Sequence, residues 1–111
     1  MATLYAQYLA ERTSDEILET QEGFATYRFL NDGKTVYIVD IYTVPDVRGR
    51  GYAAGLADII ASKAKARGAV EMIGSVMPSA KGSTTSMKVL LAYGMTLQSA
   101  AANIVVFKKD L

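Results

Sequence analysis

The sequence predicts an α/β fold built on a mixed β-sheet, and three observations support this. Residues 35–44 are nearly all β-branched or aromatic, which is typical of a strand at the centre of a sheet. Residues 51–67 carry apolar side chains at the spacing of an amphipathic helix, and residues 70–77 resemble a second buried strand. A strand, a helix and a strand in this order imply a parallel pair joined by a right-handed crossover.

The first third of the chain predicts a short helix and a β-hairpin. Residues 3–12 place aromatic and apolar side chains at helical spacing, and residues 17–18 predict a short strand. Residues 24–30 alternate as a strand does. Residues 31–34, Asn-Asp-Gly-Lys, then separate this strand from residues 35–44. An Asp-Gly pair between two β-rich runs is a strong signal for a tight turn, because these residues tolerate positive φ.

Proline and glycine mark the ends of the central elements. Pro45 ends the strand before it because proline cannot donate to a sheet ladder, and Pro78 ends residues 70–77 in the same way. Gly68 is the expected terminator of the helix over 51–67. This helix is expected to bury one stripe of side chains, formed by Ala53, Leu56, Ala57, Ile60 and Ala64.

The last third predicts a second helix and two strands. Residues 83–93 form the helix, which ends at Gly94 and is expected to carry three apolar side chains on one face, Met87, Leu90 and Leu91. Residues 95–98 and 103–109 predict two final strands. The apolar run at residues 104–107 needs a core to lie against.

Composition excludes several classes of protein. The 111 residues are expected to form one domain, 1–111. The formal net charge of +1 is too small for a protein that coats a nucleic acid, so no nucleic-acid partner is expected. The chain has no cysteine and no histidine, which excludes disulfides, cysteine nucleophiles, serine–histidine triads and the usual zinc sites. We expect no bound metal.

Membrane and export signals are also missing from the sequence. No run of about 18 apolar residues occurs, so no membrane partner is expected. The N-terminal residues lack a basic region followed by an apolar stretch, which is the pattern of a signal peptide. The expected location is therefore the cytoplasm.

The segment most informative about function links the central strand to the following helix. The start of this helix lacks Ser, Thr, Asp or Asn to cap its amides, and has no acid before Asp58. Free amides at a helix start bind anions, glycines admit a phosphate closely, and arginines add charge-assisted hydrogen bonds. The alternative is a plain turn with solvated arginines. The segment that predicts a phosphate site is Arg48-Gly49-Arg50-Gly51-Tyr52-Ala53.

Two widespread phosphate motifs fit this segment poorly. A Walker loop requires Gly-Lys followed by Ser or Thr, which the chain lacks. The run Gly49-x-Gly51-x-x-Ala54 nominally matches a dinucleotide fingerprint. However, four residues separate the strand from the first glycine, and Glu71 opens the following strand instead of closing it. A dinucleotide-binding fragment is therefore the weaker alternative.

A third motif fits better. Arg48-x-x-Gly51-x-Ala53 resembles Arg/Gln-x-x-Gly-x-Gly/Ala, the pyrophosphate-binding signature of the GNAT superfamily of N-acetyltransferases. Residues 40–51 are similar to a common strand-and-loop stretch of that family. Residues 91–95 resemble the end of its second helix, and residues 106–111 resemble a common family ending. The resemblance covers roughly residues 22–111.

The resemblance implies a GNAT-like mixed sheet with helices on both faces. It also implies transfer of an acetyl group from acetyl-coenzyme A to a primary amine. Because the chain has no cysteine, the amine would attack the thioester directly in a ternary complex. The strands that end at Val44 and Met77 would splay apart to admit the pantetheine arm. The implied coenzyme-binding backbone groups belong to Ile41, Tyr42 and Thr43, around the acetyl carbonyl, and to Arg48, Gly49, Arg50, Gly51, Tyr52 and Ala53, around the pyrophosphate.

The sequence departs from the family pattern at two places. Leu90 stands where the family often carries a tyrosine proposed to protonate the leaving thiolate. Only roughly 20 residues precede the first convincing strand, where the family usually has about two helices. These departures support the alternative of a catalytically silent coenzyme A-binding or structural module. The short N-terminal part, together with the exposed edge that the two terminal strands would leave, also suggests a homodimer that covers this region.

Asp40 is the candidate catalytic residue. It lies in an otherwise apolar strand, where we expect it on the same face as Ile38, Tyr42 and Val44. A carboxylate there is either a satisfied structural aspartate or a group that binds the acceptor amine and takes its proton.

Four other polar residues are weaker candidates, and the acceptor is open. Tyr37 stands where some family members carry a general-base acid, and a tyrosine cannot act as a base near neutral pH. Tyr42 and Tyr93 are weaker candidate acids, and Glu71 is expected on the surface. A small amine, a peptide N-terminus and a protein lysine all remain open as acceptors.

Overall fold

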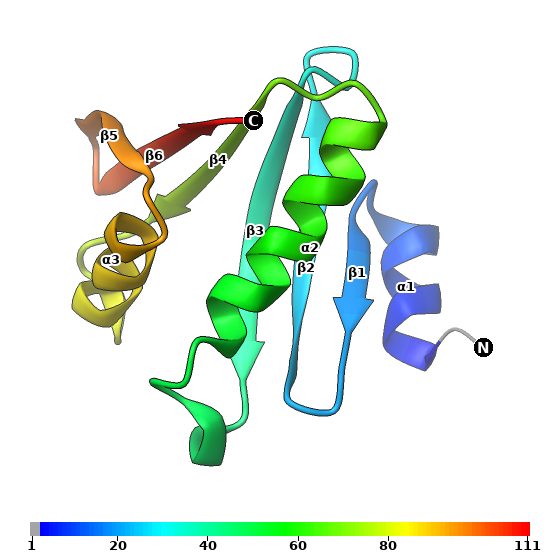
Figure 1. Cartoon of the computed structure of the whole chain (residues 1–111), viewed down its shortest axis with the longest axis horizontal. Helices are drawn as coiled ribbons and strands as arrows, with labels where there is room; N and C mark the ends of the chain where they lie inside the picture. Colours follow the sequence, from blue (N-terminus) through cyan, green and yellow to red (C-terminus); the bar gives the residue numbers. More distant parts are fainter. Residues whose placement is uncertain (1–2) are drawn as a thin grey trace.

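A computed structural model describes residues 3–111, apart from the side chains of Ser83 and Thr85. Within these residues, six strands form one mixed sheet in the order β1-β2-β3-β4-β6-β5 (Figure 1). The strands are β1 Glu16–Glu19, β2 Gly23–Leu30, β3 Thr35–Thr43, β4 Glu71–Val76, β5 Thr96–Ala101 and β6 Ile104–Asp110. The helices are α1 Leu4–Arg12, the 3₁₀ helix η1 Pro45–Val47, α2 Tyr52–Ala66 and α3 Ser83–Ala92.

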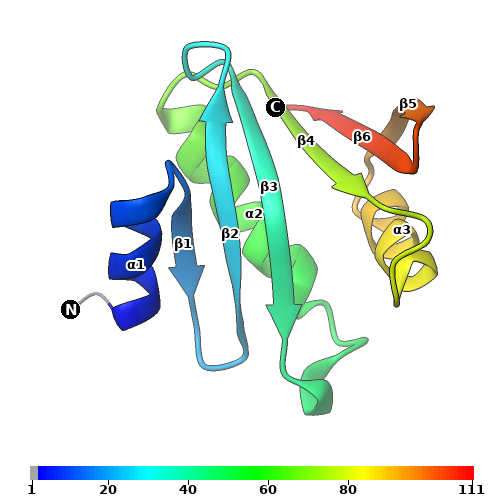
Figure 2. The same ribbon diagram turned by 180° about the vertical axis from the view of Figure 1, so that it is seen from behind.

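Helices cover both faces of the sheet. α2 and α3 lie on the face toward the viewer in Figure 1, and α1 lies on the face toward the viewer in Figure 2. The predicted α/β class and the predicted mixed sheet with helices on both faces are confirmed. Residues 1 and 2 of the predicted domain lie outside the described residues.

The predicted hairpin between β2 and β3 is present. The two strands pair antiparallel from Gly23↔Thr43 to Leu30↔Thr35. The turn between them places Asn31, Asp32 and Gly33 at φ values of 53°, 57° and 85°. These positive angles explain the composition of the turn, because Asn, Asp and Gly adopt them at the lowest cost.

A β-bulge at Val39 divides β3 into two halves. Thr26 pairs with Asp40 and Tyr27 pairs with Ile38, so Val39 is the extra residue. Before the bulge, Ile38 faces the core beneath α2, whereas after it Ile41 does so. The expectation that Asp40 shares a face with Ile38 is therefore wrong. The extra residue turns the exposed Asp40 to the face opposite α2.

β3 and β4 form the predicted parallel pair, but only over half their length. The pairing runs from Thr35↔Glu71 to Ile38↔Gly74 and then stops. β3 continues to Thr43 alongside β2, and β4 continues to Val76 alongside β6. The two strands diverge beyond Ile38 (Figures 1 and 2), as the resemblance implied. The bulge at Val39 lies where the divergence begins.

The core lies between α2 and the centre of the sheet. α2 buries most of its predicted stripe, namely Leu56, Ala57, Ile60 and Ala64, against residues such as Val36, Met72 and Phe107. In α3, Met87 and Leu90 pack against this core. Leu91 is 56% exposed, so its predicted place on the buried face is wrong. β5 begins one residue later than predicted, at Thr96, and ends three residues later, at Ala101, and all six of its residues are exposed.

Candidate functional site

The loop between β3 and α2 gives α2 a start without a side-chain cap. η1 turns the chain after Val44, and Gly49 and Gly51 then adopt φ values of 80° and 84°. Gly51 is the N-cap residue of α2, and no side chain bonds to the first turn. A β-carbon built on either glycine would meet no atom within 4 Å. Glycine is therefore needed for its backbone angle, and it leaves open space beside the helix start.

The amides of the loop divide into two groups. Arg48 N donates to Pro45 O and Arg50 N donates to Val47 O, both at 3.3 Å. Within residues 3–111, no hydrogen bond engages the amides of the other four predicted loop residues, Gly49, Gly51, Tyr52 and Ala53. These free donors stand at the positive end of the α2 dipole, which is the arrangement that binds an anion.

The two arginines of the loop differ in their contacts. The Nε of Arg48 donates to Thr43 O at 3.0 Å, and its guanidinium carbon lies 5.3 Å from the centre of the Tyr42 ring. Arg48 thus braces the loop against the end of β3. Arg50 is exposed and has no recorded side-chain partner in the described chain. Arg50 is therefore the arginine available to an anion.

The predicted acetyl-binding residues lie on the diverging half of β3. Ile41, Tyr42 and Thr43 come after the last parallel pair, so their strand has no partner on its β4 side. Thr43 leads directly into η1 and the loop, and the carbonyl of Thr43 already accepts from Arg48. The free strand edge and the free loop amides therefore belong to one continuous stretch of chain.

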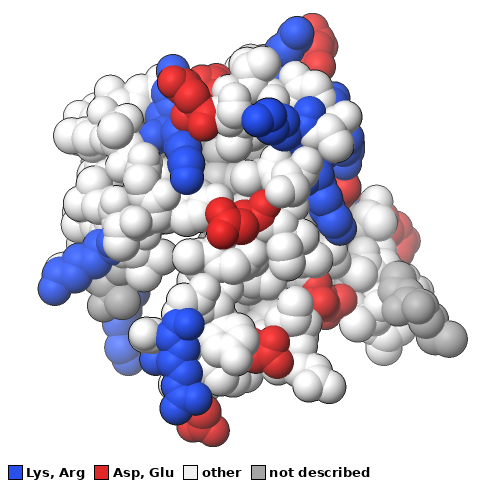
Figure 3. All heavy atoms as spheres, viewed as in Figure 1, with Lys and Arg blue, Asp and Glu red and all other residues white. Residues whose placement is uncertain are grey.

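A cavity beside the loop contains residues that sequence reasoning missed. It has a volume of about 390 Å³, and its lining includes the predicted residues Arg50, Gly51 and Tyr52. The rest of the lining comes from α2 and from the chain around the β1–β2 turn: Thr20, Glu22, Gly55, Leu56 and Ile59. Only a contact between distant segments creates this cavity, so no local pattern could have indicated it. On the face seen in Figure 3, basic side chains at the end that holds the loop stand beside acidic ones.

Two of the weaker candidates are engaged elsewhere. The Tyr93 hydroxyl donates to Asp58 Oδ1 at 2.7 Å on α2. Burial raises the pKa of Tyr93, and the hydrogen bond and charge of Asp58 raise it further. Glu71 accepts from the Thr35 hydroxyl at 2.8 Å, which lowers the pKa of Glu71. Glu71 is therefore held in place and is not a free surface acid.

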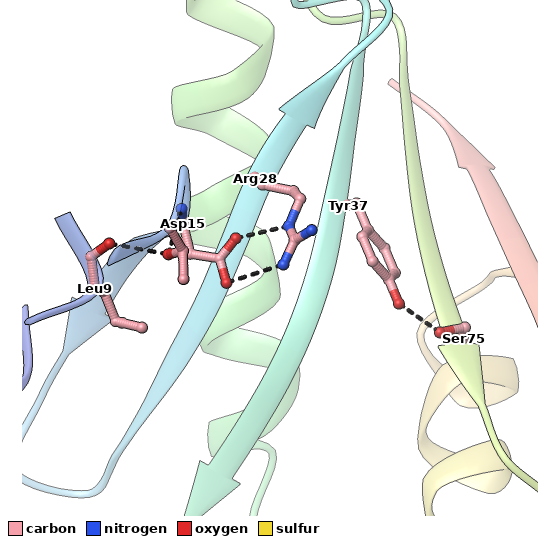
Figure 4. A network of polar contacts seen from close by, with 6 residues as sticks. Leu9, Asp15, Arg28, Tyr37 and Ser75 are labelled. Atoms are coloured by element: carbon pink, nitrogen blue, oxygen red, sulfur yellow. Dashed lines mark hydrogen bonds and ion pairs between the residues drawn. The ribbon is translucent and has the colours of Figure 1, made fainter. Parts of the chain in front are cut away.

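Leu90 and Tyr37 lie near the point where β3 and β4 diverge. A β-carbon built on Gly74 would lie 3.6 Å from a methyl carbon of Leu90, so Leu90 packs directly on β4. The Tyr37 and Ser75 hydroxyls lie 2.6 Å apart (Figure 4). An apolar side chain therefore fills the position where the family tyrosine is expected, and a hydroxyl pair bridges the two strands.

A family comparison agrees with this geometry. The model of the acetyltransferase (GNAT) family matches residues 8–84, well over half of the chain and including the whole loop. This chain belongs to the GNAT acetyltransferase family. The matched part of the GNAT domain runs from α1 to the first residues of α3. No curated protein matches the sequence.

Solved GNAT structures share the fold at low sequence identity. The PaiA N-acetyltransferase of Thermoplasma acidophilum, in complex with coenzyme A, has a TM-score of 0.76 at 11% identity, over 95% of this chain and 66% of that one. A GNAT acetyltransferase of Elizabethkingia anophelis with acetyl-CoA bound has a TM-score of 0.74 at 17% identity, over 97% and 82%. A Bacillus subtilis acetyltransferase in complex with CoA scores 0.71 at 17% identity, over 96% and 82%.

At these low sequence identities, the structural similarity shows a shared fold and no more. The chain spans 66% of the Thermoplasma protein and 82% of the other two, so those proteins contain segments with no counterpart here. Among the described residues of this GNAT domain, no helix is both long and apolar enough to cross a membrane.

Proposed function

We propose that this GNAT domain binds acetyl-coenzyme A and transfers its acetyl group to a primary amine. One observation carries the proposal. The free edge of β3 over residues 39–43 leads directly into a loop with four free amides at the start of α2. The amides of Gly49, Gly51, Tyr52 and Ala53, together with the Arg50 side chain, would hold the pyrophosphate.

The diverging strand edges suit the acyl end of the substrate. Backbone groups of Ile41, Tyr42 and Thr43 have no strand partner on the β4 side. They would bind the pantetheine arm and stabilise negative charge on the acetyl oxygen during attack. A bond then forms between the amine nitrogen and the acetyl carbon, and the carbon–sulfur bond breaks. The products are an amide, coenzyme A thiolate and a proton.

We assign to Asp40 the role of accepting the proton that the amine loses. An alkylamine is only about 0.1% neutral at pH 7, so transfer requires a group that binds the ammonium and accepts its proton. Asp40 is an exposed carboxylate on the diverging half of β3. It would pass the proton on to water.

A second candidate is a catalytically silent coenzyme A-binding module, and Leu90 favours it. Its packing on Gly74 leaves no hydroxyl at the family tyrosine position. Thiols have a pKa near 8.5, however, so the thiolate can leave without an acid. For this reason we favour the enzyme. The homodimer and the cytoplasmic location stay predictions.

Release of free thiol from acetyl-coenzyme A, measured with a panel of amines and peptides, tests the proposal. We expect acceptor-dependent release by the wild type. Asp40→Asn should slow it by about 10- to 1000-fold while coenzyme A binding is kept. Asp32→Asn, which removes a carboxylate from the distant hairpin turn, is the matched control. Tight coenzyme binding without acceptor-dependent release would favour the silent module.

A further inference from the structure

Three aromatic rings form a partly exposed surface on the face opposite α2. The Tyr5 and Phe24 ring centres lie 6.0 Å apart, and Phe24 and Tyr42 stack at 5.7 Å. Tyr5 and Tyr42 each remain 44% exposed. We refer to Tyr5, Phe24 and Tyr42 as the aromatic surface. Its rings come from α1, β2 and β3, so it exists only in the folded chain.

The aromatic surface lies beside the diverging half of β3. Tyr42 follows the bulge and points away from α2, as does Asp40 two residues before it. Residues two apart on one face of a strand are separated by roughly 7 Å. The Asp40 carboxylate and the Tyr42 ring are therefore separated by roughly the length of a short alkyl chain between an amine and an aromatic ring. Both residues belong to the strand where the thioester is proposed to bind.

The charges around Asp40 leave it available to a cation. No hydrogen bond or ion pair of Asp40 is recorded within residues 3–111. Arg28, on the same face of β2, is held in a two-point ion pair by Asp15, at 2.6 and 3.2 Å (Figure 4). The Arg48 side chain is held by a hydrogen bond to Thr43 O and by its contact with the Tyr42 ring.

A buried polar atom lies in the same row as Asp40. The Thr26 side chain is directly across from Asp40 in the sheet and is 2% exposed, yet its Oγ1 has no hydrogen-bond partner among the described residues. Buried hydroxyls are normally bonded, and this unsatisfied one occupies the cross-strand position next to the exposed carboxylate of Asp40.

From this arrangement we propose that the acceptor is a primary amine that carries an aromatic ring. Its ammonium binds Asp40 and its ring packs on the aromatic surface. This inference rests on the proposed acetyl transfer and names the substrate class for the same site. The negative charge of Asp40 favours an ammonium group at one end of the acceptor. The exposed rings of Tyr5 and Tyr42 favour an aromatic ring at its other end.

Binding of two matched amines by the full chain tests the inference directly. In the presence of coenzyme A, we expect 2-phenylethylammonium to bind about tenfold more tightly than propylammonium, and to shift the NMR amide signals of Phe24, Asp40 and Tyr42. Tyr42→Ser should remove the tenfold preference, and Asp40→Asn should weaken both amines. In the transfer assay, Tyr5→Ser, which lies outside the coenzyme loop and β3, should raise KM for the aromatic amine and leave KM for acetyl-coenzyme A unchanged.

Two further variants control the experiment. Tyr8→Ser removes an α1 tyrosine that is 54% exposed and has no recorded contact with the aromatic surface, so it should change nothing. Tyr5→Ser should weaken the preference for the aromatic amine without altering β3 or the contact between Arg48 and the Tyr42 ring. Equal binding of the two amines, or equal effects of Tyr42→Ser and Tyr8→Ser, would overturn the inference. Self-association that Tyr42→Ser abolishes would also overturn it, since a second copy would then cover the surface.

The proposed function is tested separately, by the rise in melting temperature on adding coenzyme A. A protein that shows this rise and transfers acetyl groups, but does not distinguish the two amines, refutes the aromatic acceptor alone.

Discussion

The hydroxyls of Tyr37 and Ser75 lie 2.6 Å apart and join β3 to β4 at the point where the two strands begin to diverge. Either group can donate. We expect Tyr37→Phe and Ser75→Ala each to lower the free energy of unfolding by about 1 kcal/mol, because each leaves a partly buried hydroxyl unpaired. The double variant should lose little more than either single one. Urea denaturation of all four proteins measures this coupling, and purely additive losses would contradict it.

Gly51 is expected to matter for ligand binding more than for stability. Gly51→Ala and Gly33→Ala both place a β-carbon at φ near 85°, in open space. Each should therefore destabilise the fold by a similar amount, about 1–2 kcal/mol. Only Gly51→Ala should also abolish the rise in melting temperature with coenzyme A. Equal responses of the two variants to coenzyme A, measured by thermal unfolding, would remove Gly51 from the site.

Substitutions of Arg48 and Arg50 should have separate effects, the first on the stability of the fold and the second on the binding of coenzyme A. Arg48→Ala removes the hydrogen bond to Thr43 O and the contact with the Tyr42 ring, so it should lower the melting temperature. Arg50→Ala should leave the melting temperature unchanged and weaken coenzyme A binding by about tenfold, the effect of one charge-assisted hydrogen bond. Calorimetric titration with coenzyme A checks this. An Arg50→Ala protein with wild-type affinity would show that the loop amides act alone.

Tyr93 should make the fold sensitive to alkaline pH. Burial and the neighbouring Asp58 raise the pKa of Tyr93 in the folded protein, whereas an unfolded tyrosine ionises near pH 10. The stabilisation is therefore present below pH 10 and is lost progressively as the pH rises above it. Tyr93→Phe should lose less stability than the wild type between pH 9 and about 11. Parallel urea unfolding curves at the two pH values test this, and equal losses would contradict it.

Local signals in the sequence predicted the parts of the fold that depend on neighbouring residues. The Asn-Asp-Gly turn, the apolar stripe of α2 and the order of the elements are examples, because turn angles and helix periodicity are read within a few residues. The loop at Arg48–Ala53 was found in the same way, through its missing cap. These signals sufficed to place the family and the candidate phosphate site.

The features that the sequence misplaces or does not indicate depend on contacts between distant residues. No glycine or other local signal marks the bulge at Val39, so strict alternation along the strand predicts the wrong face for Asp40. The contacts of the Arg48 side chain with Thr43 O and the Tyr42 ring also come only with the folded loop, and the role of Arg48 at the pyrophosphate stays a prediction. The cavity beside Arg50 and the aromatic surface join residues from three elements each, and sequence order does not indicate such neighbours.

The bulge at Val39 also makes this strand tolerant of one particular deletion. Tyr27 pairs with Ile38 and Thr26 pairs with Asp40, so Val39 is the residue in excess on β3. Removing Val39 would make Ile38 and Asp40 consecutive, and strict alternation would then keep Asp40 and Tyr42 opposite α2 and Ile41 on the core side. Removing a paired residue such as Ile41 would instead exchange inside and outside for the residues between it and the loop.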